Sequence, residues 1–168
     1  TIINCHVNIN VSGGDSSSFI GGLVGDNAMT TDYFPIPGTR GGWIFNCCTT
    51  GSVSGGDSSD SIGGLVGYFG DGSITNSYST AHVTGGKESM GLGGLVGDIG
   101  TILGDSGGWV ANCYATGVVT SGEGSLYIGG LVGGIWLGGV SNSFWDVETT
   151  GQTTSDGGTG KTTAQMKD

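Results

Sequence analysis

The sequence predicts an all-β protein built as a parallel β-solenoid, and three observations predict it. The pentapeptide GGLVG occurs four times, an asparagine stands 17 residues before each copy, and short segments of alternating apolar and polar residues lie between them. The 39 glycines among 168 residues are poor material for a helical bundle. We expect four full turns of about 30–42 residues, followed by a partial terminal turn.

Each repeat has a part of fixed length and a part of variable length. The fixed part joins an asparagine (Asn4, Asn46, Asn76 and Asn112) to the first glycine of GGLVG (Gly21, Gly63, Gly93 and Gly129). A fifth asparagine, Asn142, opens a partial repeat that has no GGLVG. The part between GGLVG and the next asparagine varies from 8 to 20 residues, as surface loops do. We therefore expect equivalent residues to stack in columns, with turns that start near residues 1, 43, 73, 109 and 139.

Each repeat is expected to contain three short strands. One precedes the asparagine, and a second follows it with the alternation of a half-buried strand. The third runs over Ile20–Val24 and its counterparts in the other repeats. The alternation changes phase at the asparagine, so a corner is expected there.

The repeats are expected to form one domain over residues 1–150. The polar segment 151–168 is either a tail or the start of a cap. The loop Asp26–Gly42 contains both prolines and the one arginine, Arg40. Aromatic residues and arginine on an insert suit recognition of a partner, and the alternative is a loop that folds over the flank of the solenoid.

The charge of the chain argues against a nucleic-acid partner. Fourteen acidic residues against four basic ones give a net charge of −10, which repels phosphate. The longest apolar stretch without a charge, Leu126–Val140, is too short and too rich in glycine to cross a bilayer. We expect neither nucleic-acid binding nor membrane insertion.

Three acidic residues are weak candidates for a metal site. Asp15, Asp57 and Glu123 occupy equivalent turn positions, and Lys87 interrupts the series. Carboxylates stacked about 4.8 Å apart repel one another unless a cation or water screens them. Calcium is therefore a candidate ligand, the alternative is a hydrated acidic edge, and no other cofactor is expected.

Signs of catalysis are few. Asp146 and Glu148 are close in sequence and are the kind of carboxylate pair that a glycosidase requires. Charged residues near a chain end are more often simply solvated. We therefore expect that the protein is not an enzyme.

The cysteines fall at one inward-facing position of the repeat. Cys5, Cys47 and Cys113 share it, and serines take the same place in the other repeats. A buried cysteine is a good small hydrophobe, so Cys113 is predicted to be a buried free thiol. Cys5 and Cys47 stand in adjacent repeats, at a spacing that also permits a disulfide, and both states remain open.

The repeats resemble the GLUG motif, the IGGLVG-type repeat of large surface proteins of bacteria and archaea. Ile20–Gly25, Ile62–Gly67 and Ile128–Gly133 match it, Leu92–Gly97 differs by one conservative residue, and Asn112–Gly117 is a typical companion segment. The resemblance implies an adhesin-like module in the extracellular space or at the cell surface. It implies no reaction.

We therefore expect a non-enzymatic extracellular module with a structural or adhesin-like role. Its expected partners are a second copy stacked end to end as a fibre, the neighbouring repeats of a longer chain, or a surface glycan. The alternative is a carbohydrate-binding or polysaccharide-processing solenoid. A groove lined by aromatic residues and paired carboxylates would favour the alternative, and smooth stacked faces would favour the structural role.

Overall fold

The computed structural model describes residues 1–28, 41–100 and 107–168, and nearly all regular structure in these ranges is β-strand. The short helix α1 (Val147–Thr150) is the exception within the described ranges. Residues 29–40, the larger part of the loop Asp26–Gly42, lie outside the described residues. No helix of the described ranges is long and apolar enough to cross a membrane.

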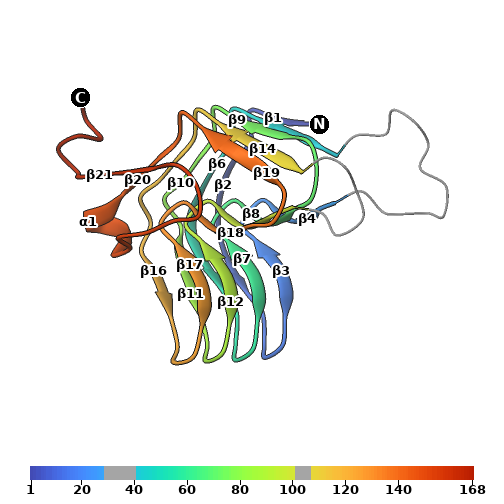
Figure 1. Ribbon diagram of the computed structural model, residues 1–168. Helices are drawn as coiled ribbons and strands as arrows, with labels where there is room; N and C mark the ends of the chain where they lie inside the picture. Colours follow the sequence, from blue (N-terminus) through green and yellow to red (C-terminus); the bar gives the residue numbers. More distant parts are fainter. Residues whose placement is uncertain (29–40, 101–106) are drawn as a thin grey trace.

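The strands form four parallel sheets, named A to D here (Figure 1). Sheet A takes one strand from each of five repeats: β1 (Ile2–Ile3), β5 (Trp43–Phe45), β9 (Ser73–Thr75), β14 (Gly108–Ala111) and β19 (Gly138–Ser141). Sheet B contains β2 (His6–Ser12), β6 (Cys48–Ser54), β10 (Tyr78–Ser79), β11 (His82–Gly85), β15 (Tyr114–Ala115), β16 (Val119–Ser121), β20 (Phe144–Asp146) and β21 (Thr159–Lys161).

Sheets C and D each take one strand from each of the first four repeats. Sheet C contains β3 (Ser18–Gly21), β7 (Asp60–Gly63), β12 (Met90–Gly93) and β17 (Leu126–Gly129). Sheet D contains β4 (Val24–Asn27), β8 (Val66–Phe69), β13 (Val96–Ile99) and β18 (Val132–Ile135). The chain passes through A, B, C and D in the same order in each of these repeats, an arrangement that fits a β-helix or solenoid.

Equivalent residues of successive repeats pair in register, as the constant spacing predicts. Gly21 pairs with Gly63, Gly63 with Gly93, and Gly93 with Gly129. The asparagines form a second column, in which Asn46 donates from Nδ2 to Asn4 Oδ1 at 2.6 Å. All five asparagines have a positive φ, between 42° and 56°. The predicted glycine and asparagine columns, and the corner at each asparagine, are confirmed.

The expectation of three strands per repeat is wrong, because the segment Ile20–Val24 is not one strand. The chain bends at Gly22 and Leu23, where the N–H groups of Leu23 and Val24 both donate to Leu65 O, at 2.9 and 3.2 Å. A Cβ on Gly21 would collide with the carbonyl of Val24, so the tight corner requires glycine. The bend recurs in each repeat and divides the expected strand between sheets C and D.

The core is a stack of apolar side chains enclosed by the sheets. Leu65, Leu95 and Leu131 are fully buried in one column. No repeat has an apolar interior of its own, so the stacking of repeats supplies the burial. The column continues at Leu23, which is only partly buried because it belongs to the first repeat.

The cysteines occupy the inward position that the sequence predicts. Cys47 and Cys113 are buried, and their N–H groups donate at 3.0 Å to the hydroxyls of Ser77 and Ser143 in the adjacent repeats. All four cysteines of the chain are free thiols, Cys5 included. Burial raises the pKa of Cys113 to about 11, which keeps this thiol protonated and unreactive.

The polar segment 151–168 folds back over the last repeats (Figure 1). Its strand β21 pairs in parallel with β20. The Ser155 hydroxyl accepts a hydrogen bond from Val132 N at 2.9 Å, and Thr154 O accepts one from Gly130 N at 3.0 Å. Asp156 N also donates to Val132 O at 3.2 Å, so the segment supplies hydrogen-bond partners to β20, to the start of β18 and to the corner before it.

Candidate functional site

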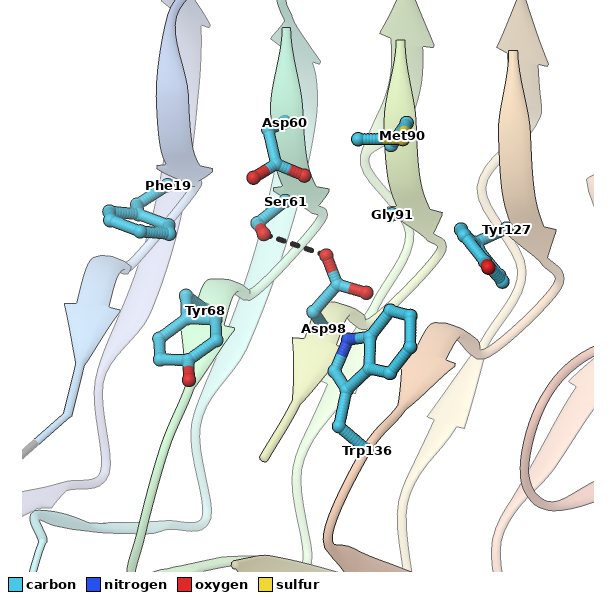
Figure 2. Close-up of a pocket in the computed structure, with 9 residues that line it drawn as sticks. All are labelled: Phe19, Asp60, Ser61, Tyr68, Met90, Gly91, Asp98, Tyr127 and Trp136. Carbon is cyan, nitrogen blue, oxygen red and sulfur yellow. Dashed lines mark hydrogen bonds between the residues drawn. The ribbon is translucent and has the colours of Figure 1, made fainter. Parts of the chain in front are cut away.

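A groove lies on the outside of the molecule where sheets C and D meet (Figure 2). It encloses about 490 Å³, a volume within the usual range of small-molecule sites. Four successive repeats contribute to it, from Phe19 in the first to Tyr127 and Trp136 in the fourth. Repeats stack about 4.8 Å apart, so the groove extends about 14 Å from the first repeat to the fourth.

One wall of the groove is a column of residues in the left-handed backbone conformation. Phe19, Ser61, Gly91 and Tyr127 stand two residues before each GGLVG, and their φ values are 58°, 53°, 65° and 56°. This conformation costs a residue with a side chain roughly 1–2 kcal/mol. Bulky residues persist there only when the surrounding structure holds them, and such strain is concentrated at functional sites.

Aromatic pairs flank the two ends of the groove. Phe19 lies against Tyr68, with ring centroids 5.1 Å apart, and Tyr127 meets Trp136 edge to face at 5.2 Å. Three of these rings are open to solvent, since the exposed fractions are 40 % for Phe19, 50 % for Tyr127 and 62 % for Trp136. Exposed aromatic faces on a concave surface are typical of ligand-binding sites.

The centre of the groove is acidic. Asp98 on β13 points into it and is only 5 % exposed, and Asp60 on β7 stands at its rim (Figure 2). The Ser61 hydroxyl donates to Asp98 Oδ2 at 2.7 Å. A Cβ on Gly91 would collide with the same oxygen. Gly91 therefore leaves the space into which the carboxylate extends.

The second carboxylate oxygen of Asp98 has no partner. Among the described residues, Oδ1 is the one buried side-chain nitrogen or oxygen without a hydrogen bond. Burial raises the pKa of Asp98 to about 6, and the nearby Asp60 and Asp156 carboxylates act in the same direction. The Ser61 hydroxyl and the Trp136 indole N–H oppose that rise. The indole N–H nevertheless lies outside hydrogen-bonding geometry, so Oδ1 keeps an open acceptor site.

The acidic turn residues predicted as metal candidates make hydrogen bonds with the backbone of adjacent repeats. Asp15 Oδ1 accepts a hydrogen bond from Asp57 N at 2.9 Å, and Asp57 Oδ1 accepts one from Lys87 N at 2.8 Å. Glu123 O accepts the N–H of Glu88 in the adjacent repeat. Over the described residues, no three His, Cys, Asp or Glu side chains gather closely enough to hold a metal ion.

Asp146 and Glu148, the pair considered for glycoside chemistry, hold the C-terminal segment in place. Asp146 Oδ1 caps α1 by accepting from Glu148 N at 2.9 Å, and its Oδ2 accepts from the Thr163 hydroxyl at 2.7 Å. Glu148 Oε2 accepts from Thr163 N at 2.8 Å. These contacts lie apart from the groove, and through them both carboxylates stabilise the packing of the C-terminal segment.

The residues of the groove were not among the candidates from sequence, although a signal is present. The position two residues before GGLVG holds a different residue in each repeat, and two of the four are aromatic. The position that follows GGLVG directly is equally varied and holds Asp26, Tyr68, Asp98 and Gly134. A column that varies within an otherwise regular repeat is not fixed by the stacking, so it is a place to look for a candidate site.

Comparison with known proteins gives one match. Residues 58–84 match the GLUG motif. The matched segment contains one GGLVG, the Asn76 corner, and the groove residues Ser61 and Tyr68. No curated protein and no solved structure matches the chain significantly. The resemblance drawn from the sequence is thus confirmed over this repeat.

Proposed function

We propose that the protein is an extracellular, non-enzymatic β-solenoid module of four full turns and a partial fifth that binds carbohydrate in the groove. The observation that carries this proposal is the set of exposed aromatic rings on both sides of an acidic centre. The C–H faces of sugar rings pack on aromatic rings, and sugar hydroxyls donate to carboxylates. A module with this property would act as the adhesive part of a surface protein.

The groove favours this function over a purely structural one. A structural solenoid needs only smooth stacked faces, whereas here Phe19 and Tyr127 occupy strained backbone positions and remain exposed. End-to-end stacking into a fibre stays a prediction. Light scattering on the 168-residue chain tests it, since a fibre subunit grows in mass with concentration and a monomer does not.

Replacement of Trp136 tests carbohydrate binding. Trp136→Ala removes the most exposed ring of the groove and is expected to weaken binding of oligosaccharides at least tenfold in a glycan array followed by calorimetry. Trp109→Ala is the matched control, because Trp109 is 55 % exposed on sheet A, outside the groove. Equal binding by both variants and the native chain would contradict the proposed site.

Polysaccharide cleavage is the second candidate, and Asp98 is the observation that favours it. A carboxyl group whose pKa is raised by burial, with a second carboxylate nearby, is the pattern of a glycosidase acid and its partner. Release of reducing ends from the oligosaccharides that bind separates cleavage from binding. Asp98→Asn would abolish such release if the groove is catalytic.

A further inference from the structure

The centre of the groove contains a hydrogen-bond acceptor that has no positively charged partner. Asp98 Oδ1 is buried and without a partner, and Asp60 adds a second carboxylate. None of the described residues that line the groove is basic. A buried acceptor left unpaired is costly, and a charged one more so. A ligand that brings a hydrogen-bond donor to Oδ1 offsets this free-energy cost, and a positively charged donor offsets more of it than a neutral one.

The arrangement along the groove limits the shape of that ligand. One aromatic pair stands in repeats one and two, and the other stands in repeat four. Asp98 belongs to repeat three, between them. A small quaternary ammonium ion would reach the centre alone, whereas a chain of two or three rings also reaches the aromatic pairs at both ends, about 14 Å apart.

Resting on the proposed function, we propose that the groove selects an oligosaccharide with a free amine, an amino sugar, whose ammonium group donates to Asp98 Oδ1. Ring faces on either side of the amine pack on Phe19 and Tyr68 at one end and on Tyr127 and Trp136 at the other. An N-acetylated sugar lacks the positive charge and carries a bulkier group at the same position. A sugar acid is repelled by Asp60 and Asp98.

Gly91 and Ser61 are positioning residues in this scheme. Gly91 leaves room for the carboxylate, and the Ser61 hydroxyl holds Oδ2. The other oxygen, Oδ1, is then directed toward Gly134 and the Trp136 indole, whose exposed ring must move aside for a ligand to reach it. Among the described residues, Tyr68 and Gly134 stand in the place of Asp98 in the second and fourth repeats, and Asp26 in the first repeat has Phe19 in the place of Gly91. The amine site is therefore single and lies in the third repeat.

Calorimetric titration with three β-1,4-linked trimers tests the inference. The probes are the trimers of glucosamine, N-acetylglucosamine and glucose, in a buffer with salt near 0.15 M that screens distant charges. The native chain is expected to bind the glucosamine trimer about tenfold to a hundredfold more tightly than the other two. Asp98→Asn keeps the shape of the side chain and is expected to lose this preference.

Two further variants keep the result interpretable. Glu123→Gln removes the same charge from an exposed turn outside the groove and is expected to keep the preference. Gly91→Ala places a methyl group where the carboxylate lies and is expected to lose it, as Asp98→Asn does. If Glu123→Gln also loses the preference, the net charge of the chain explains the preference, and the inference is overturned.

The outcomes separate this inference from the function on which it rests. Equal binding of the three trimers, with loss of all binding in Trp136→Ala, overturns the amine site and keeps carbohydrate binding. Absence of binding to all three trimers overturns both. A preference for the amine that survives in Asp98→Asn places the cation elsewhere and overturns the assignment to Asp98.

Discussion

Three positions of the repeat adopt the left-handed conformation, and two of them, the asparagine corner and the corner that lines the groove, use it in opposite ways. The corner between sheets A and B is asparagine in all five repeats, and side-chain hydrogen bonds join three of the four neighbouring pairs. The corner that lines the groove holds Phe19, Ser61, Gly91 and Tyr127, a different residue each time. Asparagine suits this conformation, and bulky aromatic residues do not.

The difference shows how one repeat can combine a stabilising corner with the proposed binding site. The asparagine corner takes the residue that the backbone favours, so its contribution is to stability. The groove corner accepts strain at Phe19 and Tyr127 and a buried acid at Asp98. Substitutions at the first corner should therefore change stability alone, and those at the second should change binding at little or no cost in stability.

The largest expected effect is a pH-dependent gain in stability from Asp98→Asn. The pKa of Asp98 is raised to about 6 in the folded chain from an ordinary value of 3.8. Between these values the folded state holds a proton that the unfolded state has lost, so native stability falls as pH rises. The stability difference between Asp98→Asn and the native chain should grow by about 3 kcal/mol from pH 3 to pH 7.

Urea unfolding at a series of pH values measures this difference. Asp60 on β7, Tyr68 on β8 and Asp156 in the C-terminal segment influence Asp98 or are influenced by it, and they are present in both proteins. Glu123→Gln is the control for charge and should give a flat difference. A flat difference for Asp98→Asn as well would show that this acid is not buried in the native state.

The asparagine corner should respond with a loss of stability. In Asn76→Ala, the left-handed backbone remains and the acceptor for Asn112 Nδ2 is removed, so unfolding should cost about 2 kcal/mol less. Asn76→Gly keeps a residue that tolerates the conformation and should lose less. Binding in the groove should stay unchanged in both variants. Weaker binding in Asn76→Ala would break the division between the two corners.

The smallest expected effect concerns the stability of alanine and glycine variants. An alanine variant is usually the more stable of the two, and at Tyr127 this order should reverse. At Tyr127, with φ of 56°, glycine relieves the strain that alanine keeps, so Tyr127→Gly should be about 1 kcal/mol more stable than Tyr127→Ala. At Tyr114, in strand β15, alanine should be the more stable. Thermal or urea unfolding of the four variants gives both orders. The same order at both positions would remove the argument from strain.

The sequence carries most of the fold and little of the groove, for a physical reason. A spacing of 17 residues fixes which residues stack, so the glycine and asparagine columns follow from it. The bend at Gly22 and Leu23 does not follow, because a run such as Ile20–Val24 is apolar enough for one straight strand. On a straight strand, positions 19 and 26 point away from one another. Across the observed corner, Ser61 reaches Asp98 of the next repeat.

The tryptophan side chains provide the most direct test of the groove as the binding site. The chain has four, of which Trp43 and Trp109 are exposed on sheet A, Trp145 is buried, and Trp136 stands in the groove. In a ¹H–¹⁵N NMR titration with the glucosamine trimer, the indole signal of Trp136 should shift and the other three should stay in place. Shifts of Trp43 and Trp109 with an unchanged Trp136 would contradict the account and place the ligand on sheet A.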